Sequence, residues 1–344
     1  MLRILLKSSM NIVIGIPTTE SGDYIYKSLV RIYDEILQCS GDDYQFKIVL
    51  CINGICHDDV AKEVYRFFRD HNIAEEDYAV LVNQDAGKNN AMNRIVQYAR
   101  NLGDIDIIHF FDDDVVLKRG SLSCNLKALI THERQHAEPA LVGSAYIAEI
   151  FPFRYFLKLS NPFGAFMKWV FHRIISQPYR ITAPRPKFCE GPSFCVYLKY
   201  MPVLPDDMLG ITDDAFLSNY FAVQGKEYYR KYGRLPIIKP QESVSYIKLP
   251  LSYGEWMRQQ IRVHAGIERA FQYFSVERTY LEKVFAWEYA FNKLSRIPLV
   301  NASISQRILR AIYMLLHDIN RRIARKYIKQ NSVPVWAIAK STKK

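Results

Sequence analysis

The chain has 344 residues, of which 49% are hydrophobic and 24% charged, and its formal net charge is +11. This composition is that of a globular protein, which excludes a disordered chain, and the length is sufficient for two compact units. No run of about 18 uninterrupted apolar residues is present, so we expect no membrane-spanning helix. The cysteines form no C-x-x-C pair, and several lie in apolar runs, which predicts reduced thiols in a cytoplasmic protein.

The first 150 residues alternate between strand-like and helix-like segments. We predict strands over 11–16, 46–52, 79–82 and 105–111, and helices over 24–37, 58–69 and 88–100. Alternation of this kind favours a doubly wound α/β sheet. Ligands bind such sheets at the carboxyl ends of the strands, so the turn that follows the first strand is a candidate site. Lys88 is a second candidate, because its ammonium and the free backbone N–H groups of a helix start both favour phosphate.

Three consecutive carboxylates follow the strand predicted over 105–111. Asp112, Asp113 and Asp114 stand where that apolar run stops. Carboxylates packed together repel one another unless a cation neutralises them, and the first and third are able to share one hard divalent ion. The alternative is a solvated acidic turn.

Two later segments combine apolar and basic side chains. Residues 151–175 interleave aromatic residues with Lys and Arg and contain no acid, which is typical of an interfacial segment. A buried helical hairpin is the alternative. Residues 304–329 predict a basic helix with one broad apolar face, made of Ile308, Ile312, Leu315, Leu316, Ile319 and Ile323. Basic segments of this kind suit an anionic membrane, a phosphorylated substrate or nucleic acid.

Two further motifs carry polar side chains. Thr212-Asp213-Asp214 precedes a predicted helix over 215–221, where Thr212 is a candidate N-cap and both acids fall in the first turn. Gln259 and Arg262 are three residues apart on a predicted helix, so they share one face.

In this order and spacing the motifs resemble those of the family 2 glycosyltransferases, over residues 11–266. Residues 87–93 look like the family's G-K-x-x-A-x-N, Asp112 and Asp114 its D-x-D, residues 212–214 its T-E-D, and residues 259–263 its Q-x-x-R-W. Val263 replaces the tryptophan of the last motif, and Trp256 is a candidate to supply the missing aromatic platform. Asn53 stands where an acid that reads the nucleobase is expected.

The resemblance implies a GT-A fold, which is a doubly wound mixed sheet with a C-terminal helical extension. Residues 1–225 would form the catalytic domain with a basic aromatic insert at about 151–189. Residues 226–300 would form an acceptor-side helical region, and residues 301–344 a basic amphipathic helix and tail.

The resemblance also implies an inverting, metal-dependent transfer of a sugar from a nucleotide-diphosphate donor, with a preference for UDP-sugars. Asp112 and Asp114 would hold Mg²⁺ or Mn²⁺, and Asp214 would be the general base, with Asp213 as a second negative charge beside it. The residues expected to bind the donor and its phosphates are Pro17, Thr18, Glu20, Asn53, Lys88, Asn93, Asp112, Asp113, Gln259 and Arg262.

The basic aromatic segments favour a glycan or polyprenyl-diphosphate-linked acceptor at an anionic membrane. We therefore expect a cytoplasmic protein, peripheral on the inner face of the membrane, in polysaccharide or glycoconjugate biosynthesis, and no nucleic acid partner. Two alternatives remain open. A haloacid-dehalogenase-like phosphatase would use Asp112 as nucleophile and Asp114 as acid/base, and a non-catalytic protein would bind a membrane or nucleic acid through the same scaffold.

Overall fold

The computed structural model describes residues 9–18, 22–39, 43–54, 57–84, 87–176, 188–189, 191–285 and 303–329. They fall into two compact units. The first, here called the sheet unit, comprises Met1–Ala145, Cys189–Asp207 and Tyr220–Ser245. The second, the helical unit, comprises Tyr146–Phe188, Met208–Asn219 and Tyr246–Lys344.

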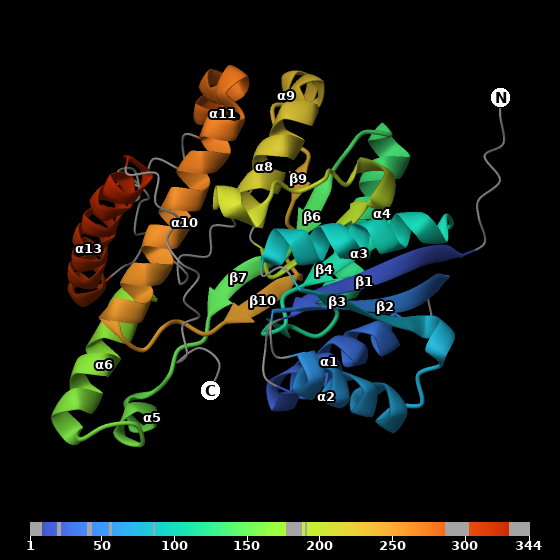
Figure 1. The fold of residues 1–344 in the computed structure, drawn as a ribbon. Coiled ribbons are helices and arrows are strands. Elements are labelled where there is room, and N and C mark those ends of the chain that lie inside the picture. The colour runs from blue at the N-terminus through green and yellow to red at the C-terminus, as the bar shows by residue number, and fades with distance from the viewer. Residues whose placement is uncertain are drawn as a thin grey trace. The chain divides into compact units, whose positions relative to one another are not determined.

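A mixed seven-stranded sheet of order β3-β2-β1-β4-β8-β6-β9 organises the sheet unit (Figure 1). Its strands are β1 (Met10–Thr18), β2 (Tyr44–Asn53), β3 (Tyr78–Asn83), β4 (Ile107–Phe111), β6 (Leu141–Gly143), β8 (Ser193–Tyr197) and β9 (Ile237–Ile238). Strands β1 to β4 are parallel to one another, whereas β8 runs antiparallel to both β4 and β6. The predicted doubly wound mixed sheet is therefore confirmed.

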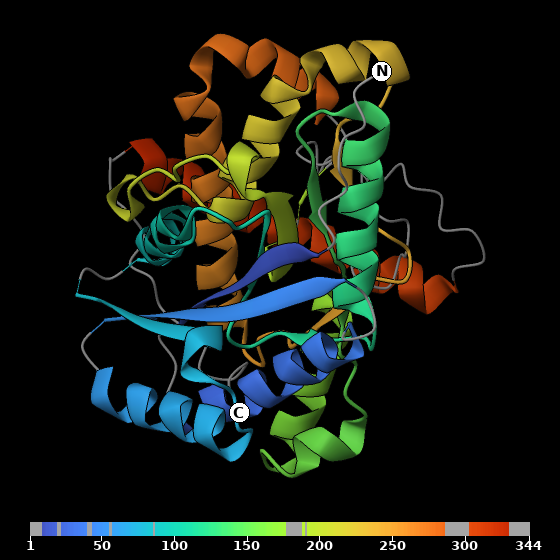
Figure 2. The same cartoon turned by 90° about the vertical axis from the view of Figure 1, so that its right-hand side faces the viewer.

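Helices cover both faces of this sheet. They are α1 (Gly22–Gln38), α2 (His57–Asp70), α3 (Lys88–Leu102) and α4 (Ser121–His136). The short helix α9 (Lys226–Tyr232) packs through Tyr228 on His132 and His136 of α4. Figure 2 shows α1 and α2 on one side of the strands and α3 on the other. Because β1 is packed on both faces, its residues Ile12, Val13, Ile14 and Ile16 are all buried, which explains the uninterrupted apolar run in the sequence.

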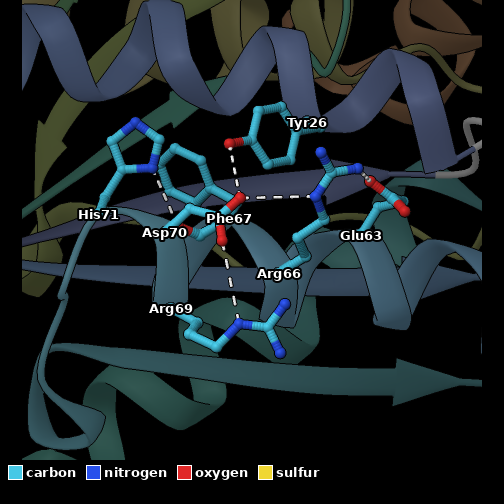
Figure 3. Close-up of polar contacts among 7 residues, drawn as sticks. All are labelled: Tyr26, Glu63, Arg66, Phe67, Arg69, Asp70 and His71. Atoms are coloured by element: carbon cyan, nitrogen blue, oxygen red, sulfur yellow. Dashed lines mark hydrogen bonds and ion pairs between the residues drawn. The ribbon is translucent and has the colours of Figure 1, made fainter.

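Helices α1 and α2 pack against each other through aromatic contacts and a surface polar network (Figure 3). The Tyr26 hydroxyl donates to the Asp70 carboxylate at 3.0 Å, and Arg66 Nε lies 3.4 Å from the same carboxylate. The rings of Tyr26 and Phe67 meet edge to face, with centroids 5.9 Å apart. Since exposed ion pairs contribute little stability, the apolar core beneath accounts for most of this packing.

The remaining elements are mostly short or belong to the helical unit. A second sheet has the order β5-β10-β7, with β5 (Val116–Leu117), β10 (Val244–Ile247) and β7 (Ala145–Ala148). The other helices are α5 (Phe153–Leu157), α6 (Pro162–Ile175), α8 (Asp213–Gln224), α10 (Tyr253–Tyr273), α11 (Arg278–Val284) and α13 (Ile304–Lys329). Turns of 3-10 helix occur at η1 (Glu75–Asp77), η2 (Leu198–Tyr200), η3 (Asp207–Leu209) and η4 (Ser275–Glu277).

The helical unit has its own apolar core, in which α10 packs on α13 and α13 on α6 (Figure 1). The core consists of Ala148, Ile174, Ile175, Leu249, Trp256 and Tyr313. Trp256 is buried in it, so the interpretation of this tryptophan as the missing aromatic platform is wrong. Residues 151–175 form the α5–α6 pair, whose last residues enter this core while Phe163, Phe166 and Met167 stay exposed.

The cysteines of the described segments form no disulfide bond: they are Cys39, Cys51, Cys124, Cys189 and Cys195. Among the helices of the described segments, none is both long and apolar enough to cross a bilayer.

Candidate active site

The site begins at the carboxyl ends of β1 and β4, which lie side by side at the centre of the sheet. The chain leaves β1 towards β2 and β3 on one side and returns to β4 on the other. In doubly wound folds, ligands bind at such a change of direction. Thr18 ends β1, and the three consecutive aspartates follow β4 directly.

The three aspartates alternate between buried and accessible positions. Asp113 is only 8% exposed, and its carboxylate accepts a hydrogen bond from the Thr18 hydroxyl at 2.8 Å. Its backbone carbonyl accepts one from the Ser28 hydroxyl on α1. Asp112 and Asp114 are half-buried on either side. Asp113 thus ties β1 and α1 to the end of β4 and leaves the first and third carboxylates accessible.

Lys88 reaches the first of these carboxylates. It begins α3, and its Nζ lies 2.6 Å from Asp112 Oδ1 in a half-buried ion pair. A cationic group therefore already lies against Asp112. The donor set of Asp112 and Asp114 consists of oxygen atoms only, which suits Mg²⁺ or Mn²⁺. Over the described residues no group of three or more His, Cys, Asp or Glu side chains is placed to hold a metal.

The N-terminus of α3 is not open for phosphate, contrary to the sequence prediction. The backbone N–H groups of Asn89 and Asn90 donate to the two carboxylate oxygens of Asp207, at 3.1 and 2.8 Å. Gly87 makes this possible: its φ is +151°, and a Cβ there would lie 2.0 Å from Asp207 Oδ2. Asp207 caps the helix from 118 residues away, and no local sequence signal pointed to it.

Asn53 and Asn93, two of the predicted donor-binding residues, hydrogen-bond to protein groups. Asn53 is buried, and its Nδ2 donates to the Gly87 carbonyl at 2.6 Å. The Asn93 side chain exchanges two hydrogen bonds of 2.8 Å with the backbone of Leu204. Asn53 thus holds the residue that precedes α3, and Asn93 holds the segment that leads to Asp207. Their contact with a donor stays a prediction, as does that of Pro17, which is buried in β1, and Glu20 lies outside the described residues.

In the helical unit, Asp213 and Asp214 occupy the first turn of α8 as predicted. Asp213 is buried and Asp214 is half-buried, so Asp214 is the more accessible acid. The predicted cap is wrong in its detail, because the buried Thr212 hydroxyl finds no hydrogen-bond partner among the described residues. The Ala215 N–H instead donates to Asp214 Oδ1 at 2.7 Å.

The turn that carries these acids rests on α10 at Gly266. A Cβ at that glycine would lie 2.5 Å from Thr212 Cγ2 and 3.1 Å from the Thr212 backbone nitrogen. Arg262 precedes Gly266 by one helical turn, and Gln259 precedes Arg262 by three residues, so all three share one face of α10. Nothing in the sequence around Gly266 points to it, because its importance depends on a contact between two distant segments.

The structure therefore contains two groups of candidate residues. Thr18, Lys88 and the three consecutive aspartates are assembled in the sheet unit, and Asp213, Asp214, Gln259 and Arg262 in the helical unit. The first group offers carboxylates and an ammonium to a phosphorylated ligand. The second offers an accessible carboxylate near a helix start together with an amide and a guanidinium.

Comparison with known proteins adds information on the fold. No family model matches the sequence, and no curated protein matches it. Among solved structures, the chain is similar to that of the mannosyltransferase PcManGT from Pyrobaculum calidifontis in complex with GDP-mannose and Mn²⁺. The TM-score is 0.54 and the sequence identity is 13%, and the match covers 92% of this chain and 88% of PcManGT. A second similar structure is S. aureus TarS 1–349 in complex with UDP, with a TM-score of 0.44 and 12% identity over 94% of this chain and 92% of that one. The mixed sheet with its helical C-terminal region is thus a fold shared with a glycosyltransferase.

Proposed function

We propose that this protein is an inverting, metal-dependent glycosyltransferase of the family 2 type that takes its sugar from a nucleotide-diphosphate donor. The observation that carries the proposal is the pair of half-buried carboxylates Asp112 and Asp114 at the carboxyl ends of β1 and β4, with Lys88 against the first. The fold shared with a mannosyltransferase supports this reading over a phosphatase. UDP-sugars are the first donors to test, and GDP-mannose is the second because the structure of PcManGT holds it.

The sheet unit would bind the donor. Asp112 and Asp114 would hold a Mg²⁺ or Mn²⁺ ion, which when bound neutralises charge on the departing diphosphate. Lys88 would add a second positive charge for the same phosphates. Asp113 and Thr18 would keep the end of β4 fixed through their buried hydrogen bond, so that the flanking carboxylates stay oriented. Gln259 and Arg262 would contact the phosphates or the sugar from α10.

Asp214 would act as the general base. It would take the proton from the acceptor hydroxyl as that oxygen bonds to the anomeric carbon, while the bond to the diphosphate breaks and the nucleoside diphosphate leaves with the electron pair. A single displacement of this kind inverts the configuration at the anomeric carbon. General-base assistance typically contributes about 10²–10⁴ in rate. Asp213, buried beside Asp214, would add a second negative charge at the same turn.

For the acceptor we propose a glycan or polyprenyl-diphosphate-linked sugar at an anionic membrane surface, with the protein peripheral on the cytoplasmic face. The exposed aromatic residues of α6 and the basic composition of residues 150–189 support this choice.

The proposal is tested by product analysis on the full chain. Incubation with UDP-sugars and GDP-mannose, Mn²⁺ and lipid-linked acceptors should release a nucleoside diphosphate without inorganic phosphate. Asp214→Asn should abolish transfer and leave donor binding intact, whereas Asp114→Ala should weaken both. Release of inorganic phosphate from phosphate esters would favour the phosphatase alternative, and wild-type turnover in Asp214→Asn would exclude the assignment of the base.

A further inference from the structure

Helix α13 packs into the helical unit through an unusual face. Its buried residues are Arg310, Tyr313, His317, Asn320 and Ala324, which is a largely polar and aromatic set. The Tyr313 ring lies against Trp256 of α10, with centroids 5.9 Å apart. The His317 ring meets His264 edge to face at 4.5 Å. The helix is therefore an integral part of the unit, and its polar side faces the protein.

The opposite side of α13 is aliphatic and open to solvent. Ile304, Ile308 and Leu315 are 79%, 55% and 63% exposed, and Ile312 and Ile319 are also exposed. Their spacing of four, four, three and four residues places them on one stripe, here called the α13 stripe. The sequence predicted an apolar face that included Leu316, but Leu316 packs against the core of the unit and is not part of the stripe.

Basic residues border this stripe. Arg307, Arg322, Arg325, Lys326 and Lys329 are exposed on α13, and the single acid of the helix is Asp318, which pairs with Arg322 at 2.9 Å. An aliphatic stripe bordered by cations is the pattern of a helix that lies in the plane of a membrane interface. The like charges would repel each other if two copies of the stripe faced one another, and they attract anionic headgroups.

A second surface of the same unit has the same chemistry. Phe163, Phe166 and Met167 are exposed on α6, with Phe163 at 75%, and Arg154 and Lys158 are exposed close by in the chain. Helix α6 packs against α13 within the unit (Figure 1). Two exposed apolar and cationic segments in one compact unit are more than the scattered apolar residues of an ordinary surface.

We propose that the α13 stripe is a membrane-docking surface, which inserts its aliphatic residues into an anionic lipid interface while its basic borders contact the headgroups. This rests on the peripheral membrane association proposed above and names the surface that would make it, through exposed residues that take no part in the candidate active site. Deletion of the helix would not test it, since Tyr313 belongs to the core of the unit. Substitutions on the exposed stripe are the appropriate perturbation.

The test is co-sedimentation of the full chain with vesicles of phosphatidylcholine containing about 30% phosphatidylglycerol, compared with pure phosphatidylcholine. The variant Ile308→Gln/Leu315→Gln/Ile319→Gln removes the stripe, and Val276→Gln is the matched control because Val276 is 92% exposed in the same unit but lies outside the stripe. Unchanged circular dichroism and melting temperature would show that the variants fold.

We expect the wild type and Val276→Gln to bind the anionic vesicles, and the triple variant to lose binding by about tenfold or more. Added salt should weaken wild-type binding, because the cationic borders are screened. Equal vesicle binding by the triple variant would overturn the proposal, as would a wild type that binds no vesicles. If that non-binding wild type were a dimer in light scattering and the triple variant a monomer, the stripe would be an interface between two copies. Nucleotide-dependent stabilisation, measured in parallel, should be the same in all variants, so that failure of docking is distinguishable from failure of the proposed function.

Discussion

Gly266→Ala should impair the candidate base without unfolding the protein. The added Cβ would lie 2.5 Å from Thr212 Cγ2, whereas a carbon–carbon contact needs about 3.5 Å. Thr212 must therefore move by roughly 1 Å, and its backbone nitrogen, 3.1 Å from the new Cβ, moves with it. Because Asp214 follows two residues later, the same shift displaces its carboxylate. A misplacement of about 1 Å at a reacting group costs on the order of 10² in rate.

The effect on stability should be small, since two contributions oppose each other. Replacing Gly by Ala inside a helix stabilises by about 1 kcal/mol, and overpacking costs about 1–3 kcal/mol. The net loss is thus about 0–2 kcal/mol. Gly254→Ala is the matched control in the same helix, because its Cβ would meet only the end of the Arg258 side chain at 3.6 Å.

The assay is the turnover number for nucleoside diphosphate release, with unfolding in urea measured on the same samples. Gly266→Ala should lower kcat by about 10², and Gly254→Ala should leave it unchanged. Equal turnover numbers in the two variants would refute the role of the Thr212 contact in positioning the acid turn.

Three further predictions concern the support of the site. Asp207→Ala removes the acceptor of two N–H groups at the start of α3 and should destabilise the protein by about 1 kcal/mol. The urea midpoint should fall and amide exchange at Asn89 and Asn90 should become faster, whereas unchanged exchange would argue against the cap. Thr18→Val removes the donor to the buried Asp113 carboxylate and should cost about 1–3 kcal/mol in urea unfolding, so an unaltered midpoint would contradict the structural role of Asp113. Burial lowers the pKa of His109 from 6.5 to about 3. Below pH 6.5 the imidazole of the unfolded chain therefore takes up a proton that the folded chain does not, so the free energy of unfolding falls as the pH drops. Between pH 7 and pH 5 this should remove about 2 kcal/mol, a loss that His109→Asn should lack; an equal loss in both proteins would refute the assignment.

The sequence was informative wherever one segment determines its own environment. Strands β1, β2 and β4 are continuous apolar runs that are buried on both faces, and their predicted positions agree with the structure to within two residues at each end. The position of Asp112–Asp114 followed from the same reasoning, because acids directly after a buried strand of a parallel sheet must lie at its carboxyl edge.

What the sequence did not reveal depends on contacts between distant segments. Asp207 occupies the start of α3 from another part of the chain, and Gly266 matters only because Thr212 rests on it. Helical periodicity correctly predicted an apolar face on α13, but it did not show that the polar face would be the buried one. The burial of Trp256 likewise reflects the packing of three helices rather than any local pattern.

The most direct test of the central claim is thermal stabilisation of the full chain by UDP, GDP, CMP and TDP, each with Mn²⁺ and with EDTA. A ligand at 100 times its dissociation constant stabilises the folded state by about 2.7 kcal/mol, which a melting curve resolves. If Asp112 and Asp114 hold a metal that binds a nucleotide diphosphate, one nucleotide should stabilise the wild type only with Mn²⁺, and Asp114→Ala should lose that stabilisation. Stabilisation that is independent of both Mn²⁺ and Asp114, or no stabilisation by any of the four nucleotides, would contradict the account.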